Sequence, residues 1–315
     1  MTGIASNQLR SAFVAEATAG TTPATPSFTT SDVPINMTAA PNIVEHRSLA
    51  AKGEAVETAI AGIDVTGTMS GTLVYGAYDT FFESLLQGAY ATNVLKSAKT
   101  TKTVTVENAI GAGAGGTLTM MRYQGVEATG GSLTLSSNAE IGFSFDLTGM
   151  GSIDTTTAAI GGASYTDQTE RAPLTCGVDV GTIAFGGYTL DAFESATINF
   201  NYEGREAQTV LGSSFTKDGI TKGALLPEIT ARVYVDTNFA SLYNAARDTD
   251  HTLFSVTFPL GSVSGKKYTL VFPKCKFTSS NLDFTGNNAM QDVTIRAMYD
   301  EATEDASVKL TRAVS

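Results

Sequence analysis

A short segment that occurs twice constrains this chain more than any other feature of its sequence. Residues 78–89 (YDTFFESLLQGA) align without a gap with residues 235–246 (VDTNFASLYNAA), at an offset of 236 − 79 = 157 residues. Asp, Thr, Phe, Ser, Leu and Ala match in place, and this self-similarity indicates an internal duplication. We therefore expect two similar units that follow each other along the chain.

Each copy of the segment predicts a short helix that follows a strand. Residues 80–83 (TFFE) match the capping box, in which a glutamate side chain reaches back to the amide of the capping residue. Both copies place large apolar side chains on one helical face, which we expect to lie on a sheet. This repeated core helix consists of Phe82, Leu85 and Leu86 in the first copy and Phe239, Leu242 and Tyr243 in the second.

Alternation of apolar and polar residues predicts strands around each helix, in the same order in both halves. Residues 1–30 are small and polar, and we expect them to be loop-like, whereas the first strand stops at Ala40-Pro41. The predicted strands are 33–37, 72–78, 103–107, 117–123, 132–135 and 141–147 in the first half, and 198–202, 229–235, 253–260, 268–272, 275–277 and 293–297 in the second.

A long segment of mixed charge precedes the strand and helix of each half. These segments are residues 42–63 and 203–226, and we expect both to be loops. Compact domains seldom keep irregular loops of this length unless the loops have a function. The two segments are therefore candidate contact surfaces.

Composition agrees with a mainly β chain. Charged residues make up 16% of the sequence, hydrophobic residues 42%, and there are 31 glycines. The length suffices for two ordinary domains, each with its own core. We predict two tandem β-sandwich or split-barrel domains, each with one short flanking helix and a long inter-strand loop. The predicted division is an N-terminal arm (1–30), a first domain (31–150), a linker (151–173) and a second domain (174–315).

No arrangement of residues in the sequence indicates a catalytic or cofactor site. Gly111, Gly113 and Gly116 have the spacing of the dinucleotide fingerprint, but a β-like segment follows where that fingerprint requires a helix. His46 and His251 have no second histidine or cysteine nearby, which argues against zinc. We expect a protein that is not an enzyme and that needs no cofactor or metal.

The charge of the chain argues against nucleic-acid binding. The formal net charge is −11, and the basic residues are scattered rather than gathered in a stripe. The sequence also lacks the roughly 18 consecutive apolar residues that a membrane helix requires, and it lacks a basic start followed by an apolar core. We therefore expect a protein made in the cytoplasm, without membrane insertion.

The order of these elements resembles that of a known family. Residues 16–23 (EATAGTTP) end an N-terminal arm, residues 76–79 (GAYD) lead into the helix, and residues 268–274 (YTLVFPK) form a late strand. Over nearly its whole length the chain is similar to the tail tube (major tail) proteins of long-tailed bacteriophages with non-contractile tails. The resemblance rests on order and pattern more than on a signature motif.

The resemblance implies a structural protein of the virion. Such proteins fold as a small β-sandwich or split barrel with a flanking helix, and their sheets join in rings that stack into a hollow tube. The genome leaves through this tube. Most members have one unit per chain and six chains per ring, so a chain with two units implies a trimeric ring with pseudo-sixfold symmetry. Its implied partners are copies of itself, the tape measure protein and the tail tip and terminator proteins, with assembly in the host cytoplasm.

The dimensions of such a ring suit the passage of DNA. If each unit lends four strands, six units give about 24 strands spaced ~4.8 Å apart, which close at a diameter of roughly 40 to 50 Å. After side chains are subtracted, a DNA duplex about 20 Å across would pass with a layer of water. We expect part of the excess Asp and Glu to face this lumen, because a negative wall repels phosphate.

The two long segments are the expected contacts between successive rings. Their mixed charges suit a polar interface that orders on assembly. The charged residues concerned are Glu45, Arg47, Lys52, Glu54 and Glu57 in the first segment, and Arg205, Glu206, Lys217, Asp218 and Lys222 in the second.

Two other interpretations remain open. Another β-structured phage component, such as a capsid decoration or baseplate protein, would share this composition. A carbohydrate-binding or hydrolytic β-sandwich is a third possibility, although that class favours surface tryptophans and this chain has none.

Overall fold

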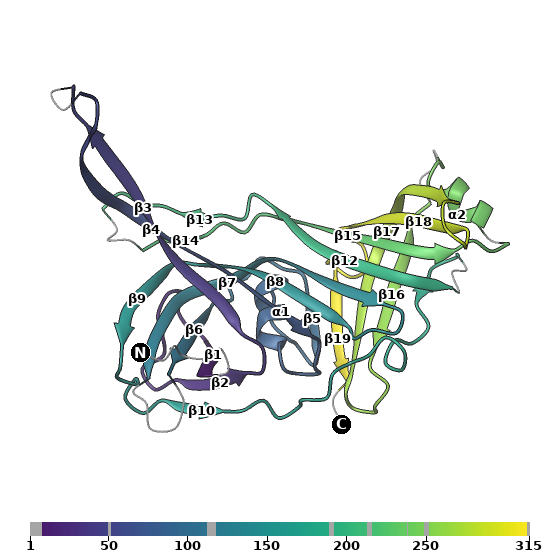
Figure 1. Cartoon of the computed structure of the whole chain (residues 1–315). Coiled ribbons are helices and arrows are strands. Elements are labelled where there is room, and N and C mark those ends of the chain that lie inside the picture. Colours follow the sequence, from purple (N-terminus) through teal and green to yellow (C-terminus); the bar gives the residue numbers. More distant parts are fainter. Residues whose placement is uncertain are drawn as a thin grey trace.

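The structure, a computed structural model, is mainly β with two short helices (Figure 1). It describes residues 8–315 except for short gaps, which are residues 50–51, 112–117, 189–191, 213–215, 238, 249–251 and 314–315. Gly113, Gly116 and His251 therefore lie outside the described residues. The prediction of a mainly β fold is confirmed.

The first half of the chain holds ten strands and helix α1 (Asp79–Leu85). The strands are β1 (Leu9–Ala15), β2 (Ser27–Ser31), β3 (Ile35–Arg47), β4 (Ala55–Thr72), β5 (Val94–Lys96), β6 (Val104–Ile110), β7 (Thr119–Ser136), β8 (Gly142–Gly149), β9 (Gly151–Thr156) and β10 (Ser164–Thr166).

The second half holds helix α2 (Phe239–Ala245) and the remaining strands. These are β11 (Ala184–Phe185), β12 (Phe193–Glu203), β13 (Ala207–Gln208), β14 (Gly219–Ile220), β15 (Ala224–Tyr234), β16 (Phe254–Leu260), β17 (Lys267–Asp283), β18 (Met290–Met298) and β19 (Lys309–Ala313).

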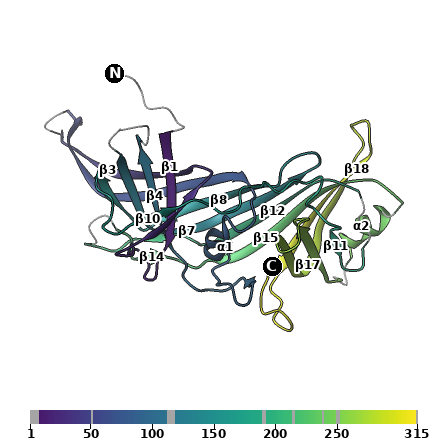
Figure 2. The same ribbon diagram turned by 90° about the horizontal axis from the view of Figure 1, so that it is seen from below.

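A continuous antiparallel sheet runs through both halves. Its strands follow one another in the order β3, β4, β8, β7, β12, β15, β18 and β17. The pairing of β7 with β12 is the joint at which the first half meets the second. Each half thus contributes four strands, and Figure 2 shows β3 and β17 toward opposite ends of the molecule.

One face of this sheet is buried and the other is polar. In β8, Phe143, Phe145 and Leu147 are buried, whereas Ser144 and Asp146 between them point to the other face. The core therefore forms on one side only, where Phe81 and Phe82 of α1 pack on Phe145.

The two halves share one strand order. In the first half β3, β4, β8, β7, β6 and β1 are neighbours in that sequence, and in the second half β12, β15, β18, β17, β16 and β11 are. In chain order the helix follows the second strand of this sequence and precedes the fifth: α1 lies between β4 and β6, and α2 lies between β15 and β16. This correspondence supports the predicted duplication.

Several local predictions are wrong. Residues 1–30 are not all loop-like, since β1 pairs with β6 and β2. The first strand does not stop at Pro41 but continues to Arg47, and segment 42–63 is mostly a β-hairpin made by β3 and β4. The predicted strands 117–123 and 132–135 are one strand, β7.

The predicted capping box is also wrong. The residue before α1 is Tyr78, which makes no capping hydrogen bond through its side chain. The Glu83 carboxylate instead accepts a hydrogen bond from the amide of Tyr90, at 2.8 Å. The helix itself is confirmed, as is its counterpart α2.

The predicted linker packs largely against the first half. Strand β9 pairs with β7 and strand β10 pairs with β2. At the other end of the chain, β19 pairs with β5 of the first half and with β17 of the second. The chain therefore crosses between its halves more often than a simple tandem arrangement requires.

Candidate functional site

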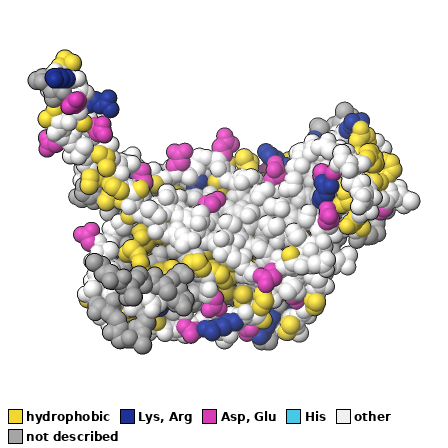
Figure 3. All heavy atoms as spheres, in the orientation of Figure 1, with side chains coloured by type: hydrophobic (Ala, Val, Ile, Leu, Met, Phe, Trp, Pro, Cys, Tyr) yellow, Lys and Arg dark blue, Asp and Glu magenta, His cyan; other side chains and the backbone are white. Residues whose placement is uncertain are grey.

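The polar face of the eight-stranded sheet is built mainly from hydroxyl and amide side chains. Small side chains of this kind recur at alternate positions because the neighbouring residues point into the core. They are Thr66, Thr68 and Ser70 on β4, Ser144 on β8, Ser132 and Thr134 on β7, Thr197 and Asn199 on β12, Thr230 on β15 and Thr294 on β18. In Figure 3 the surface over β8, β12 and β15 is mostly white, with charged side chains scattered along the margins.

The charges on this face are mostly paired. Arg232 lies 3.0 Å from Glu194, 2.7 Å from Asp283 and 3.2 Å from Asp292. Hydrogen bonds from Thr285, followed by the Arg232 guanidinium, hold the pKa of Asp283 well below its usual value. One guanidinium faces three carboxylates here, so the cluster keeps a net negative charge, which repels phosphate.

Among the other charged groups on this face, two form a pair with each other and one has no charged partner among the described residues. Arg296 lies 2.7 Å from Glu228, on the neighbouring strand. Asp146 on β8 is exposed and has no ion-pair partner within the described part of the chain.

The two strands at the ends of the eight-stranded sheet have free edges. Within the described residues β3 pairs only with β4. The last residues of β17, Ser280–Asp283, pair with β18 on one side and with no described strand on the other. Such edges expose backbone groups that can pair with another chain.

The hairpin of β3 and β4 extends from the body of the molecule (Figure 1). We call its residues 42–61 the arm. Large aliphatic side chains are exposed along it, and Leu49 near its tip is 96% exposed. The others are Ile43, Val44, Val56 and Ile60. Exposed apolar surface of this extent is typical of surfaces that contact another chain.

The predicted contact residues of the first segment all lie on the arm. Glu45, Arg47, Lys52, Glu54 and Glu57 are exposed. Arg47 and Glu45 form an ion pair of 3.4 Å with each other, and both side chains remain more than half exposed. All five are therefore available to a partner, and their role in ring contacts stays a prediction.

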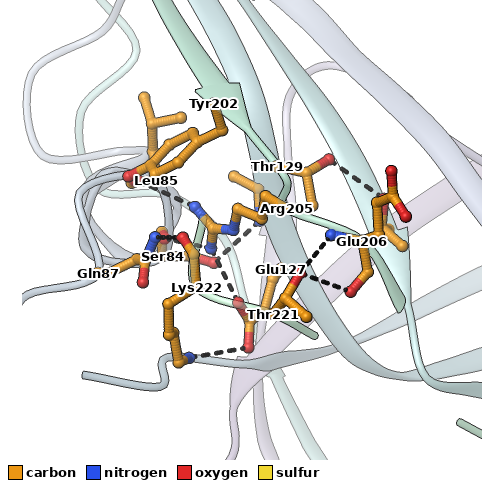
Figure 4. A network of polar contacts seen from close by, with 12 residues as sticks. Ser84, Leu85, Gln87, Glu127, Thr129, Tyr202, Arg205, Glu206, Thr221 and Lys222 are labelled. Atoms are coloured by element: carbon orange, nitrogen blue, oxygen red, sulfur yellow. Dashed lines mark hydrogen bonds and ion pairs between the residues drawn. The ribbon is translucent and has the colours of Figure 1, made fainter. Parts of the chain in front are cut away.

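The second segment, predicted as a loop over residues 203–226, also contains β13, β14 and the first residues of β15. Its residues 204–223, between β12 and β15, lie against the first half of the chain (Figure 4). The Arg205 guanidinium lies 2.8 Å from the Glu127 carboxylate on β7, and each side chain is 1% exposed. Arg205 also donates to the carbonyls of Ser84 (3.0 Å) and Leu85 (3.3 Å), at the C-terminal end of α1. Carbonyls in the last turn of a helix carry its partial negative charge, so a cation there is favourable.

Two lysines of this segment also bind residues of the first half. Lys217 lies 2.7 Å from Asp64 on β4, and this contact lowers the pKa of Asp64. Lys222 lies 3.7 Å from Glu127, and its carbonyl accepts a hydrogen bond of 2.6 Å from Gln87. The predicted residues Arg205, Lys217 and Lys222 thus hold the two halves together.

The other two predicted residues of this segment, Glu206 and Asp218, are exposed. The backbone amide of Glu206 donates a hydrogen bond of 2.7 Å to the Thr221 hydroxyl, and the residue remains exposed. Contact of these two residues with another ring stays a prediction.

The repeated core helix is unequally buried. Phe82, Leu85 and Leu86 are at most 3% exposed. In the second copy Leu242 is buried, whereas Phe239 and Tyr243 are only partly buried.

Sequence reasoning missed the residues that hold the other end of α1. Arg312 lies 2.6 Å from the Asp79 carboxylate, which also accepts a hydrogen bond from the Tyr268 hydroxyl. Burial, followed by the nearby Asp79 charge, raises the pKa of Tyr268 well above its usual value. Residues of the second half therefore clamp α1 at both ends, and no local motif could have revealed pairs so distant in sequence.

The described residues hold neither a cluster of metal ligands nor a membrane-spanning helix. They contain no group of three or more His, Cys, Asp or Glu side chains that could hold a metal ion. Among the same residues, no helix is both long enough and apolar enough to cross a membrane.

Comparison with known proteins yielded one family. A family model described as phage tail tube protein matches residues 6–309, which is nearly the whole chain. A search of curated proteins found no match.

Proposed function

Since the chain belongs to the phage tail tube protein family, whose members are structural components of the virion tail and assemble with one another, we propose that three copies form one ring of the tube. The proposed ring has pseudo-sixfold symmetry because each chain carries two equivalent units. The rings stack into the hollow tail of a long-tailed phage with a non-contractile tail, through which the genome is ejected.

The observation that carries this proposal is the continuous sheet of eight strands with four from each half. Three such sheets would supply about 24 strands, enough for a bore that admits a DNA duplex. Within the described residues each end strand has one free edge, β3 along its length and β17 at Ser280–Asp283, so the sheet can be continued by further copies.

The polar face of the sheet is the proposed wall of the bore. Its opposite face packs on α1 and the core and cannot face a lumen. Hydroxyl and amide groups with mostly paired charges would let the DNA backbone pass without releasing counterions, so the DNA would not be held.

The arm is the proposed contact with the next ring, through its tip. Its exposed aliphatic and charged residues would be covered on assembly. The tape measure protein and the tail tip and terminator proteins are further proposed partners, and assembly in the host cytoplasm is part of the same proposal.

Electron microscopy of the concentrated protein tests this proposal. We expect hollow rings or tubes whose axial class averages show three-fold symmetry with six similar lobes, and native mass spectrometry of single rings should give three chains. Deletion of residues 46–60 should leave a folded protein that forms no tubes. Rings of six chains, or filaments without a bore, would contradict the proposal.

A further inference from the structure

The joint between the two halves is a strand pairing whose register is known. Strand β7 pairs with β12 in antiparallel fashion, and Ser132 lies opposite Asn199. On either side of that pair, Leu133 lies opposite Ile198 and Gly131 opposite Phe200. Each half of the molecule has one strand of each kind, so the same joint is available once more.

Two β-bulges relate β7 to β17 residue by residue. In the pairing of β7 with β8 the register shifts between Ala128 and Gly130, and in the pairing of β17 with β18 it shifts between Phe277 and Ser279. The offset between these strands is therefore 277 − 128 = 149.

A second bulge gives the same value. This bulge lies in the pairing of β7 with β6 and in that of β17 with β16, next to Val126 and Cys275 respectively. The offset is again 275 − 126 = 149. Bulges are specific features of a fold, so their coincidence fixes the alignment.

A hydrogen bond common to both halves relates β3 to β12. The amide of Leu73 donates to the carbonyl of Ile141, as the amide of Val235 donates to the carbonyl of Ala289. This hydrogen bond sets the offset between β8 and β18 at 289 − 141 = 148 residues. The pairing of β8 with β7 and of β18 with β17 requires the same offset, so the hydrogen bond agrees with the bulges.

The same hydrogen bond aligns Leu73, after β4, with Val235, after β15, so the residues of β4 and β15 correspond. Because β3 pairs with β4 and β12 pairs with β15, the residues of β3 and β12 can then be matched as well. Met69 and Ala231 then correspond, and they pair with Ile35 and Ala196. Strand β12 therefore follows β3 by 196 − 35 = 161 residues.

Exposure shows where this second joint lacks its partner. Leu133 and Leu135 are 2% and 5% exposed because β12 covers them. Their counterparts are Leu282, which is partly exposed, and Phe284, which is 67% exposed. The greater exposure of Leu282 and Phe284 is what we expect if the strand that should pair with the end of β17 belongs to another copy of the chain.

We propose that the end of β17 in one copy of this chain pairs with β3 of the next copy, in the register of the internal joint. Asn281 then lies opposite Thr38 of the neighbouring copy, and Leu282 lies opposite Met37. This inference rests on the proposed ring and specifies how its subunits join. Three such joints close the sheet on itself, and no edge strand is left.

The outer edge of β3 is compatible with this pairing. Three side chains of the first half reach it: Ser11 accepts from the Ile35 amide at 3.2 Å, Asn108 donates to the Ile35 carbonyl at 2.8 Å, and Tyr123 donates to the Met37 carbonyl at 3.2 Å. A carbonyl accepts two hydrogen bonds, so Met37 remains able to pair. We therefore place the joint at residues 36–39 and not at Ile35.

The base of the arm reaches the same neighbour. Its counterpart in the second half is segment 204–223, which lies across α1 of the preceding unit and contacts its C-terminal end through Arg205. The offset of 161 residues between β3 and β12 matches Val44 with Arg205, so Ile43 and Val44 lie near α2 of the neighbouring copy. This contact would cover Phe239 and Tyr243, which are only partly buried in the single chain.

A disulfide between copies tests the register. The variant carries Thr38→Cys and Asn281→Cys, two exposed positions. Directly opposed residues of antiparallel strands lie about 4.5 to 5.5 Å apart between Cα atoms, within the range of a disulfide. We expect mild oxidation of the concentrated protein to link chains until closed trimers form on a non-reducing gel.

Matched variants control for chance contacts. Ser132→Cys with Asn199→Cys tests the internal joint and should link within a single chain. Thr38→Cys with Leu282→Cys places the two thiols on opposite faces of the sheet and should not link. All variants carry Cys176→Ser, because that native thiol is partly exposed, whereas Cys275 is buried.

Electron microscopy of the same samples separates this inference from the proposed function. Closed trimers without tubes would support the joint and contradict the tube. Tubes in which the variant with Thr38→Cys and Asn281→Cys stays unlinked would overturn the joint and leave the tube standing, and so would linkage by the mismatched pair.

Discussion

Arg205 and Glu127 form an ion pair of 2.8 Å between the two halves of the chain, with both side chains almost fully buried. The same guanidinium donates to two carbonyls at the end of α1 and lies 4.5 Å above the ring of Tyr202. It therefore links β7, α1 and the segment after β12. Because this segment belongs to the second half of the chain and its partners to the first, the ion pair holds the two halves together.

Loss of the Arg205 side chain should strongly destabilise the protein. In Arg205→Ala the Glu127 carboxylate stays buried, with Lys222 at 3.7 Å as its remaining cationic partner. We expect the free energy of unfolding to fall by about 3 kcal/mol, as found when one partner of a buried pair is removed. Urea denaturation followed by circular dichroism measures the change.

Two controls separate the buried charge from the size of the side chain. Arg205→Met with Glu127→Met removes both charges and should recover part of the loss. Arg47→Ala removes a pair that is mostly exposed and should change stability little. Equal losses in the single and double variants would show that the unpaired carboxylate is not the cause.

Alkaline pH should unfold the protein through its buried tyrosines. Burial raises the pKa of Tyr78 to about 12, and burial with a hydrogen bond to Glu107 raises that of Tyr165 to about 12. Both values exceed the value of about 10 in an unfolded chain. The folded state therefore holds these protons more tightly, and the stability they contribute is complete below pH 10 and lost as the pH rises toward 12.

Absorbance at 295 nm against pH checks this expectation. A group of tyrosines should ionise only as the circular dichroism signal of the strands disappears, and in denaturant all should ionise near pH 10. Tyr165→Phe should flatten the loss of stability between pH 10 and 12. Complete ionisation near pH 10 with the fold intact would contradict the prediction.

Gly125 should resist substitution because of its place in β7. Its φ is +61°, and an added Cβ would lie 2.5 Å from the sulfur of Met150. Gly125→Ala should therefore cost about 2 to 4 kcal/mol of stability, from backbone strain and overpacking. Gly177→Ala is the control, since nothing lies within 4 Å of its added Cβ, and thermal unfolding of the two variants should differ clearly.

A lysine on the polar face should make assembled tubes hold DNA. Asp146→Lys replaces the unpaired carboxylate of β8, and in a ring the new charges would line the bore at repeated positions. We expect tubes of this variant to retain short duplex DNA at low salt and release it steeply as salt rises. Val178→Lys places the same side chain at an exposed loop position. Equal retention by both variants would place Asp146 outside the bore.

The sequence predicts the mainly β fold and both helices, because alternation and the repeat are local signals. It failed where local signals mislead. Pro41 reads as the end of a strand, yet β3 continues through it at an edge, where the missing amide costs no pairing. The sequence therefore predicts a loop where the structure has the arm.

The roles of the charged segments could not be predicted for another reason. Arg205 and Glu206 are adjacent and read alike in the sequence, but one is buried against Glu127 and the other is exposed. The distinction depends on contacts between residues 78 positions apart. Likewise nothing near Asp79 indicates that Tyr268 and Arg312 bind it.

The aliphatic residues of the arm should matter for assembly and not for folding. Ile43 and Ile60 lie opposite each other in the hairpin and are 61% and 54% exposed. Their replacement by Thr removes little buried surface from the single chain, so the midpoint of thermal unfolding should stay within a few degrees. Tube formation should nevertheless decline severalfold, since each copy would bury these side chains against another.

Sedimentation and electron microscopy measure the amount of tube, with Val178→Thr as an exposed control that should assemble normally. Normal tubes from the arm variant would show that its aliphatic residues form no contact between copies.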